Sequence, residues 1–307
     1  MKKIELVLWF RCNSRCRFCV VDSATARQSM ETGAAIRHLE RARTEGAVAV
    51  DFGGGEPTLR DDLPELARTA KALGYTSIGV KSNGLRLCYP EVVDALLRAG
   101  VDRFTLPVWG ASPRTHDGLS QTAGSFEMLE MAVKHIIDLG GGIELDVLLT
   151  TLTVPELGML IRPFADLGVR RFSIWLYCMF GSNGTFPEFL PTLTAAGLAV
   201  AQTAAALKKN ELVLSTSHIP PCFLSDAAGL YSSIADAGLV IVTPGGSFPA
   251  ETSPFEAGMK TVRCSGCIDS GRCAGIRPEY IHRFSDGEVR PVGQTASSAP
   301  SAHGKSR

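Results

Sequence analysis

Short runs of apolar and β-branched residues alternate along the chain with segments whose apolar positions recur at helical spacing. The apolar runs predict strands at Ile4–Phe10, Ala47–Phe52, Thr76–Lys81, Arg103–Val108, Ile143–Leu149 and Arg171–Leu176. The helical patterns between them cover about residues 29–45, 60–73, 90–99, 124–139 and 155–167, and several stop at a glycine: Gly46, Gly74, Gly100, Gly140 and Gly168. The strands are apolar runs rather than alternating patterns, which is typical of a sheet covered on both faces.

This rhythm predicts an α/β fold with a parallel sheet and right-handed crossovers. Six strand–helix units are visible up to about residue 185, fewer than in a full eight-unit barrel, so we expect a partial (β/α)6 TIM-like barrel. A further helical pattern, Thr192–Lys209, precedes a stretch richer in Pro, Gly, Ser and Cys from His218 onward. We therefore divide the chain into a barrel core (1–215), a small cysteine-rich region (216–292) and a disordered tail (293–307).

Composition excludes several classes of protein. The 31 basic and 31 acidic residues cancel, and nothing forms the basic patch that nucleic-acid binding needs. There is no apolar run of membrane-spanning length and no signal peptide, so we expect a cytoplasmic protein that binds neither nucleic acid nor membrane. In that compartment the nine cysteines are expected to be metal ligands rather than disulfides where they cluster.

The most informative cysteines follow the first predicted strand. Cys12, Cys16 and Cys19 have C-x3-C-x2-C spacing. Three thiolates can bind three irons of a [4Fe–4S] cluster and leave the fourth iron open, whereas a cluster that only carries electrons normally has four cysteine ligands. A glycine-rich turn, residues 53–57, follows the second strand, and Ser82-Asn83-Gly84 follows the third. Because parallel strands end at one edge of the sheet, we expect these segments to lie together.

The cysteine spacing, with Phe18 before the last cysteine, and the turn Gly54-Gly55-Glu56-Pro57 resemble the radical S-adenosylmethionine (SAM) superfamily. The resemblance covers roughly residues 4–185 and continues less sharply to about 292. It implies that the three cysteines bind a [4Fe–4S] cluster whose fourth iron is chelated by the amino and carboxylate groups of SAM.

The resemblance also implies which residues contact SAM. Phe18 would lie near the adenine, and the Gly54–Glu56 backbone would receive the methionine amino group in a turn fixed by Pro57. Glycine permits close approach because it has no Cβ; a tight turn that needs glycine for its own shape is the structural alternative. Ser82 and Asn83 are candidates for ribose contacts, with an ordinary Asn-Gly turn as the alternative.

By the same resemblance, an electron from a donor such as flavodoxin or ferredoxin cleaves SAM to a 5′-deoxyadenosyl radical, which removes a hydrogen atom from the substrate. We prefer a small natural-product precursor, such as a sugar or aminocyclitol that is oxidised or epimerised, because the first strand begins at residue 4 and leaves no N-terminal peptide-recognition domain. A ribosomal peptide is the alternative. The rivals from other classes are a non-catalytic iron–sulfur electron carrier or sensor and a zinc-stabilised module.

A second cysteine group lies in the C-terminal region. Cys264, Cys267 and Cys273 have C-x2-C-x5-C spacing, which is similar to the auxiliary-cluster segment of radical SAM enzymes with SPASM or Twitch extensions. The SPASM pattern would add a cysteine four residues after Cys273, so a single Twitch-like [4Fe–4S] cluster fits better. Cys222 is the preferred fourth ligand and Cys178 the alternative; a structural zinc site is the other interpretation.

Several remaining polar residues are candidates for contacts with the substrate. If Cys222 is a cluster ligand, Cys178 could donate a hydrogen atom to a product radical, with a buried small hydrophobe as the alternative. Glu144 and Asp146 would be substrate acids if they point inward. The residues after the fourth strand could face the substrate or cap the next helix, and we favour the second role: Arg114, His116 and Asp117.

Overall fold

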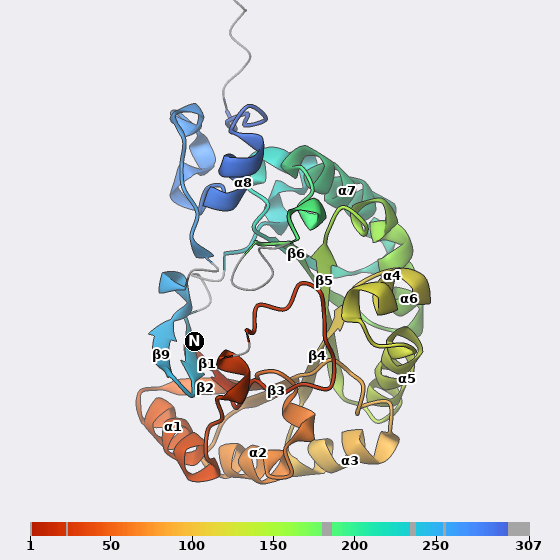
Figure 1. The fold of residues 1–307 in the computed structure, drawn as a ribbon, viewed down its shortest axis with the longest axis vertical. Helices are drawn as coiled ribbons and strands as arrows, with labels where there is room; N and C mark the ends of the chain where they lie inside the picture. The colour runs from red at the N-terminus through yellow and green to blue at the C-terminus, as the bar shows by residue number, and fades with distance from the viewer. Residues whose placement is uncertain (1, 23, 180–185, 234–237, 254–255, 294–307) are drawn as a thin grey trace, which may run out of the picture.

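The computed structural model describes residues 2–22, 24–179, 186–233, 238–253 and 256–293. Seven parallel strands follow one another in chain order: β1 (Lys2–Val7), β2 (Ala47–Gly53), β3 (Ser77–Lys81), β4 (Arg103–Val108), β5 (Gly142–Leu149), β6 (Arg171–Leu176) and β7 (Val213–Ser217). The sheet curves without closing (Figure 1), so the predicted partial barrel is confirmed. The predicted tail lies, apart from Gly293, outside the described residues.

The helices lie on the convex side of the curved sheet (Figure 1). They are α1 (Thr32–Thr44), α2 (Leu63–Ala72), α3 (Pro90–Ala99), α4 (Pro113–Ser120), α5 (Ser125–Asp138), α6 (Leu157–Leu167) and α7 (Leu193–Ala206). Proline stands in the first turn of α2, α3 and α4, where its fixed φ suits the helix and its missing N–H costs no bond. No helix within the described ranges has the length and apolar character needed to cross a bilayer.

The C-terminal region returns to the barrel sheet before it reaches the second cysteine group. Strand β8 (Leu239–Thr243) pairs in parallel with β1, and β9 (Gly246–Pro249) forms an antiparallel hairpin with it. Beyond them, α8 (Pro278–Phe284) packs its Tyr280 hydroxyl 2.8 Å from the backbone N–H of Leu193. The sheet therefore spans the predicted boundary at residue 215, which stays a prediction.

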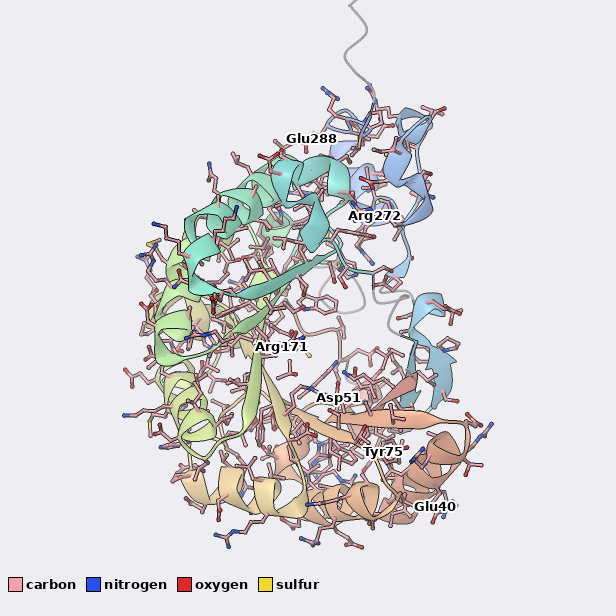
Figure 2. The ribbon with its side chains drawn as sticks, turned by 180° about the vertical axis from the view of Figure 1, so that it is seen from behind. Glu40, Asp51, Tyr75, Arg171, Arg272 and Glu288 are labelled. Carbon is pink, nitrogen blue, oxygen red and sulfur yellow. The ribbon has the colours of Figure 1, made fainter. Side chains whose placement is uncertain are left out.

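The core lies between the sheet and the helices. Leu6, Phe52 and Phe104 are fully buried there, and each such side chain contributes about 1.5–3 kcal/mol when removed from water. The Tyr75 hydroxyl donates to the carbonyl of Leu39 in α1, 2.8 Å away. Figure 2 shows the resulting layers, with Asp51 on the inner side of the sheet, Tyr75 beneath it and Glu40 on the outer surface of α1.

The concave face of the sheet is charged. Lys81 and Glu5 form an ion pair of 2.5 Å, and Lys3 pairs with Asp51 at the same distance. Burial alternates along β4 and β5, because one face packs on helices and the other does not. Consecutive residues of β2 and β3 are buried, as expected for strands covered on both faces, whereas this does not hold for β4 and β5.

Candidate active site at the carboxyl ends of the strands

The cysteine loop, residues 8–22, follows β1 and lies inside the curve of the sheet (Figure 1). It brings together Cys12, Cys16 and Cys19, which are close enough for the charges of their sulfurs to interact. Ser14 shapes the loop: its backbone N–H donates to Cys12 Sγ at 3.4 Å, and its hydroxyl lies 3.3 Å from Cys16 Sγ. The same hydroxyl donates to the Ser120 carbonyl at the end of α4, 2.9 Å away, which anchors the loop to the barrel.

Two glycines after β2 allow the cysteine loop to pack directly on the strand ends. A Cβ at Gly54 would lie 2.2 Å from the carbonyl oxygen of Trp9, and a Cβ at Gly55 would lie 2.3 Å from that of Arg11. Instead, the N–H of Gly55 donates to the carbonyl of Trp9 and the N–H of Glu56 donates to that of Arg11, both at 2.8 Å. The glycines are thus required by contact with the cysteine loop itself, a reason that the sequence analysis did not give.

Glu56 is a buried carboxylate that joins the ends of β2 and β3. Its Oε1 accepts from the hydroxyls of Thr58 and Ser82 at 2.6 and 2.8 Å, and its Oε2 accepts from the backbone N–H of Asn83 at 2.7 Å. Its own carbonyl accepts from the indole of Trp9 at 2.9 Å. Burial raises the pKa of Glu56, while the hydrogen bonds to the carboxylate oppose that rise.

The other predicted SAM contacts lie against the cysteine loop. The Asn83 side chain donates to Asn13 at 2.8 Å and lies 3.6 Å from Cys12 Sγ. Phe18 packs edge-on against Trp109, which follows β4, with ring centroids 4.4 Å apart. Pro57 begins the short 3-10 turn that follows Glu56. These residues share one rim with the three cysteines, and their contacts with SAM stay predictions.

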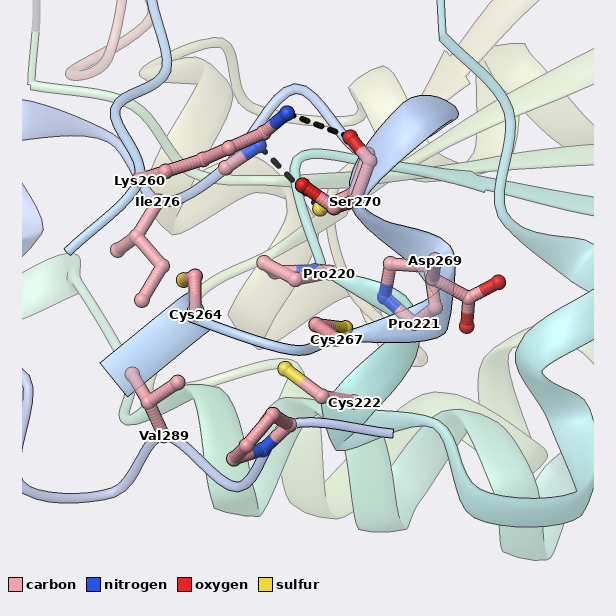
Figure 3. Close-up of a pocket in the computed structure, with 13 residues that line it drawn as sticks. Pro220, Pro221, Cys222, Lys260, Cys264, Cys267, Asp269, Ser270, Ile276 and Val289 are labelled. Atoms are coloured by element: carbon pink, nitrogen blue, oxygen red, sulfur yellow. Dashed lines mark hydrogen bonds between the residues drawn. The ribbon is translucent and has the colours of Figure 1, made fainter. Parts of the chain in front are cut away.

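The second cysteine group lines a pocket of about 400 Å³, part of which is open to solvent. Figure 3 shows Cys222, Cys264 and Cys267 around it, and Cys273 completes the lining. Within the described ranges, no three Cys, His, Asp or Glu side chains converge closely enough to bind a single metal ion. The group that these four thiols would hold, a [4Fe–4S] cluster or zinc, stays a prediction.

Burial holds the thiols of Cys16 and Cys222 in their protonated form when no metal offsets their charge. Burial raises the pKa of Cys16 to about 11, and Cys12 and Cys19 add to the rise while Ser14 opposes it. Burial also raises the pKa of Cys222 to about 12, with further contributions from Cys273 and its neighbours. Iron would supply the positive charge that thiolate ligands need, so metal binding must release protons.

Cys178 lies apart from the second group and contacts a histidine instead. Its sulfur is 3.0 Å from His218 Nδ1, and His218 Nε2 is 3.2 Å from Glu256 Oε1. Cys178 follows β6 and His218 follows β7, so both lie at the carboxyl ends of neighbouring strands. The sequence analysis missed His218 and Glu256, because neither belongs to a motif with recognisable spacing and 37 residues separate them (219–255).

Two of the three residues singled out after β4, His116 and Asp117, have structural partners. His116 Nδ1 accepts from the backbone N–H of Trp109 at 3.1 Å. Asp117 accepts from the N–H groups of Gly124 and Phe126 at 2.7 and 2.9 Å, at the start of α5. Arg114 is exposed. These contacts account for His116 and Asp117 without a ligand.

Asp146 lies on the concave face, where the indole of Trp175 donates to its Oδ1 at 3.3 Å. Burial raises the pKa of Asp146 to about 7; Lys81 opposes the rise, whereas Glu144 adds to it. A buried carboxyl group with a raised pKa is a candidate for contact with a substrate.

Comparison with known proteins identifies the family. The pattern of the radical SAM superfamily matches residues 6–161, which include the cysteine loop, the glycine turn and the loop after β3. The chain belongs to the radical SAM superfamily. As a radical SAM protein it is an enzyme that uses a [4Fe–4S] cluster and SAM, so the predicted family, enzyme class and these two cofactors are confirmed.

The names of the similar curated proteins refer to different substrates. It is 26% identical to PqqA peptide cyclase from Ruegeria pomeroyi, over 80% of this chain and 67% of that protein. It is 29% identical to the probable GTP 3′,8-cyclase from Saccharolobus solfataricus, over 46% of this chain and 45% of that protein. The chain therefore spans less than half the length of the second relative.

Solved structures show the same fold. Streptococcus suis SuiB bound to its precursor peptide SuiA has a TM-score of 0.67 at 16% identity, and the match covers 81% of this chain and 59% of SuiB. The structure of anSMEcpe with bound AdoMet and a peptide has a TM-score of 0.63 at 15% identity, over 81% of this chain and 74% of that one. At this level of sequence identity the similarity establishes the partial barrel fold and does not indicate the substrate.

Proposed function

We propose that this radical SAM enzyme modifies a peptide. The observation that carries the proposal is the match to two PqqA peptide cyclases, at 26% identity over 80% of this chain and, for Methylocella silvestris, 24% over 70%. These relatives support the ribosomal-peptide alternative better than the sugar or aminocyclitol precursor that we preferred from the sequence. That preference rested on where the chain begins, which does not determine how a peptide is recognised.

Cys12, Cys16 and Cys19 are the proposed ligands of the SAM-binding cluster. Their support is that one short loop holds all three sulfurs together, and that Ser14 bonds to two of them. The loop is fixed at the strand ends by its backbone contacts with the turn after β2. A set of three sulfur donors leaves one iron for the amino and carboxylate groups of SAM.

The proposed SAM contacts are Phe18, Gly54, Gly55, Glu56, Pro57, Ser82 and Asn83. Support is strongest for Asn83, whose side chain lies beside Cys12. Ser82 would have to share its hydroxyl with Glu56, and the carbonyl of Glu56 has one lone pair left beside its bond to Trp9. The Glu56 carboxylate is buried and would not contact SAM itself. It is a positioning group, because its hydrogen bonds fix the turn after β2 and the loop after β3.

Cys222, Cys264, Cys267 and Cys273 are the proposed ligands of a closed auxiliary [4Fe–4S] cluster in the region 216–292. The pocket that they line together is the support for Cys222 as the fourth ligand, and the bond from Cys178 to His218 is the support for leaving Cys178 out. Four protein ligands suit a cluster that carries electrons.

When bound, the cluster and SAM supply a 5′-deoxyadenosyl radical that removes a hydrogen atom from the substrate. The chain places the substrate at the rim and keeps water from the radical. Cys178 is proposed to return a hydrogen atom to the substrate radical, so that its S–H bond breaks as a C–H bond forms. A flavodoxin or ferredoxin is the proposed electron donor.

The substrate is tested anaerobically with enzyme reconstituted with iron and sulfide, SAM and dithionite. A library of synthetic peptides that includes PqqA and SuiA, the peptides named with similar proteins, is added, and GTP and aminocyclitols are added in parallel. We expect a mass change or deuterium uptake from D2O in one of the peptides, retained in Cys88→Ala, which alters a buried cysteine outside both groups, and lost in Cys16→Ala. Conversion of a small molecule while every peptide stays unchanged would overturn the proposal.

A further inference from the structure

We propose that His218 and Glu256 form a proton relay to Cys178, so that the Cys178 thiol can be restored in place after it gives up its hydrogen atom. The use of the relay rests on the proposed function of Cys178. Its geometry does not, because it consists of contacts among three side chains outside both cysteine groups.

The three side chains come from segments that are distant in the sequence. Cys178 Sγ lies 3.0 Å from His218 Nδ1, and His218 Nε2 lies 3.2 Å from Glu256 Oε1. The side chains of His218 and Glu256 are only 10% and 6% exposed. The second oxygen of Glu256 accepts from the Ser233 hydroxyl at 3.3 Å, which fixes the carboxylate. A histidine held on both ring nitrogens keeps one orientation toward the sulfur.

Both ring nitrogens of His218 face acceptors, so the doubly protonated ring suits the site. Burial lowers the pKa of His218, but the hydrogen bonds to Cys178 and Glu256 outweigh it and raise the pKa to about 9. The sulfur also lies 3.3 Å from the carbonyl oxygen of Leu176, to which its S–H can donate. With its S–H directed at Leu176, the sulfur can accept a hydrogen bond from Nδ1 of His218.

Other side chains lie around the three residues of the relay. Arg277 is the cation that faces His218 and lowers its pKa, and Tyr177 lies beside Cys178 in the chain. Trp175 packs edge-on against the imidazole with ring centroids 5.7 Å apart. His218 has φ of +68°, a conformation that is uncommon for residues with a side chain and that often marks functional positions.

The relay closes a balanced cycle. When the hydrogen atom of Cys178 moves to a carbon-centred radical, the S–H bond breaks, the C–H bond forms and a sulfur-centred radical remains. One electron from a reductant of the flavodoxin or ferredoxin class and the Nδ1 proton of His218 restore the thiol. The imidazole then regains a proton from water, and Glu256 stabilises the positive charge that returns.

The relay is tested by alkylation of Cys178 in the reconstituted enzyme, with neither SAM nor substrate present. Iodoacetamide is added at several values from roughly pH 6 to 9, and adducts are mapped by mass spectrometry. Cys88, which is buried and bonded to the Leu85 carbonyl, is the internal reference. Because a neighbouring imidazolium favours the thiolate that reacts, we expect the rate at pH 7 to fall by about tenfold in His218→Asn, which keeps a donor but carries no charge, and by less in Glu256→Gln.

Unchanged rates and pH profiles for Cys178 in both variants would overturn the relay, and so would a wild-type Cys178 that resists alkylation at every pH. Unchanged protection of Cys88 shows that the variants are folded. The outcome is independent of the peptide assay. If the alkylation rate of Cys178 depends on His218 but the enzyme leaves all peptides unchanged, the proposed substrate is wrong and the relay stands.

Discussion

The backbone N–H of Asn83 donates to Oε2 of Glu56 at 2.7 Å, and this bond ties the loop after β3 to the turn after β2. Both segments touch the cysteine loop, through Asn13 on one side and Arg11 on the other. The buried carboxylate therefore connects two segments that both contact the cysteine loop. Its charge is satisfied by donors from the protein before any ligand arrives.

Replacing Glu56 with Gln tests whether these hydrogen bonds of the carboxylate stabilise the protein. The amide would turn an NH2 group toward donors from Thr58, Ser82 and Asn83, so at least one hydrogen bond is lost. We expect the free energy of unfolding to fall by about 1–3 kcal/mol, measured by urea denaturation. Glu65→Gln, at an exposed position in α2, is the matched control. Equal effects of the two substitutions would show that Glu56 has no special structural role.

A Cβ at Gly55 should displace the cysteine loop. It would meet the carbonyl oxygen of Arg11 at 2.3 Å, so we expect Gly55→Ala to lose up to about half of the bound iron, the share of one of two clusters. Iron per chain after reconstitution is the measurement. Gly118→Ala, whose Cβ would meet nothing within 4 Å, should load fully. Full loading of Gly55→Ala would contradict the importance of this contact.

The two candidate fourth ligands of the auxiliary cluster can be separated directly. Cys222 lines the pocket with the other three cysteines, so Cys222→Ser should lower the iron content by up to about half. Cys178→Ser should leave it unchanged, because that thiol contacts His218 instead. The reverse pattern would assign the ligand to Cys178 and remove it from the proposed relay.

Asp146 should make stability depend on pH. Its pKa is raised by burial to about 7, from about 4 in an unfolded chain. Between these values the folded carboxyl keeps a proton that the unfolded one loses, so the free energy of unfolding falls as pH rises from about 4 to 7. Asp146→Asn should remove part of that fall, measured by urea denaturation across this range. Asp166→Asn, exposed on α6, should not, and indistinguishable pH profiles would contradict the assignment.

The sequence predicted those features that are encoded locally. The bounds of β4 and β6 agree with the apolar runs, and the cysteine loop and glycine turn lie at the strand ends where the parallel order placed them. Helix α4 was missed because it spans only eight residues. Two features could not be predicted from periodicity or spacing, because they join residues far apart in the chain. They are the pairing of β8 with β1 and the contacts among Cys178, His218 and Glu256.

The charged inner face shows a second limit of sequence patterns. Glu5 and Asp51 each interrupt a largely apolar strand and Lys81 ends one, and single charges in such runs are easily discounted. Their meaning appears only when the register places Glu5 beside Asp51 on neighbouring strands and Lys81 within 2.5 Å of Glu5. Paired charges cost far less to bury than isolated ones.

The central claim is that Cys12, Cys16 and Cys19 hold the cluster at which SAM is cleaved. The most direct measurement is the formation of 5′-deoxyadenosine by anaerobically reconstituted enzyme with SAM, dithionite and the library of synthetic peptides. We expect formation in the wild-type enzyme and in Cys88→Ala, and none in Cys16→Ala. Cleavage at the wild-type rate in Cys16→Ala, or no cleavage by wild-type enzyme with its iron fully loaded, would contradict the claim.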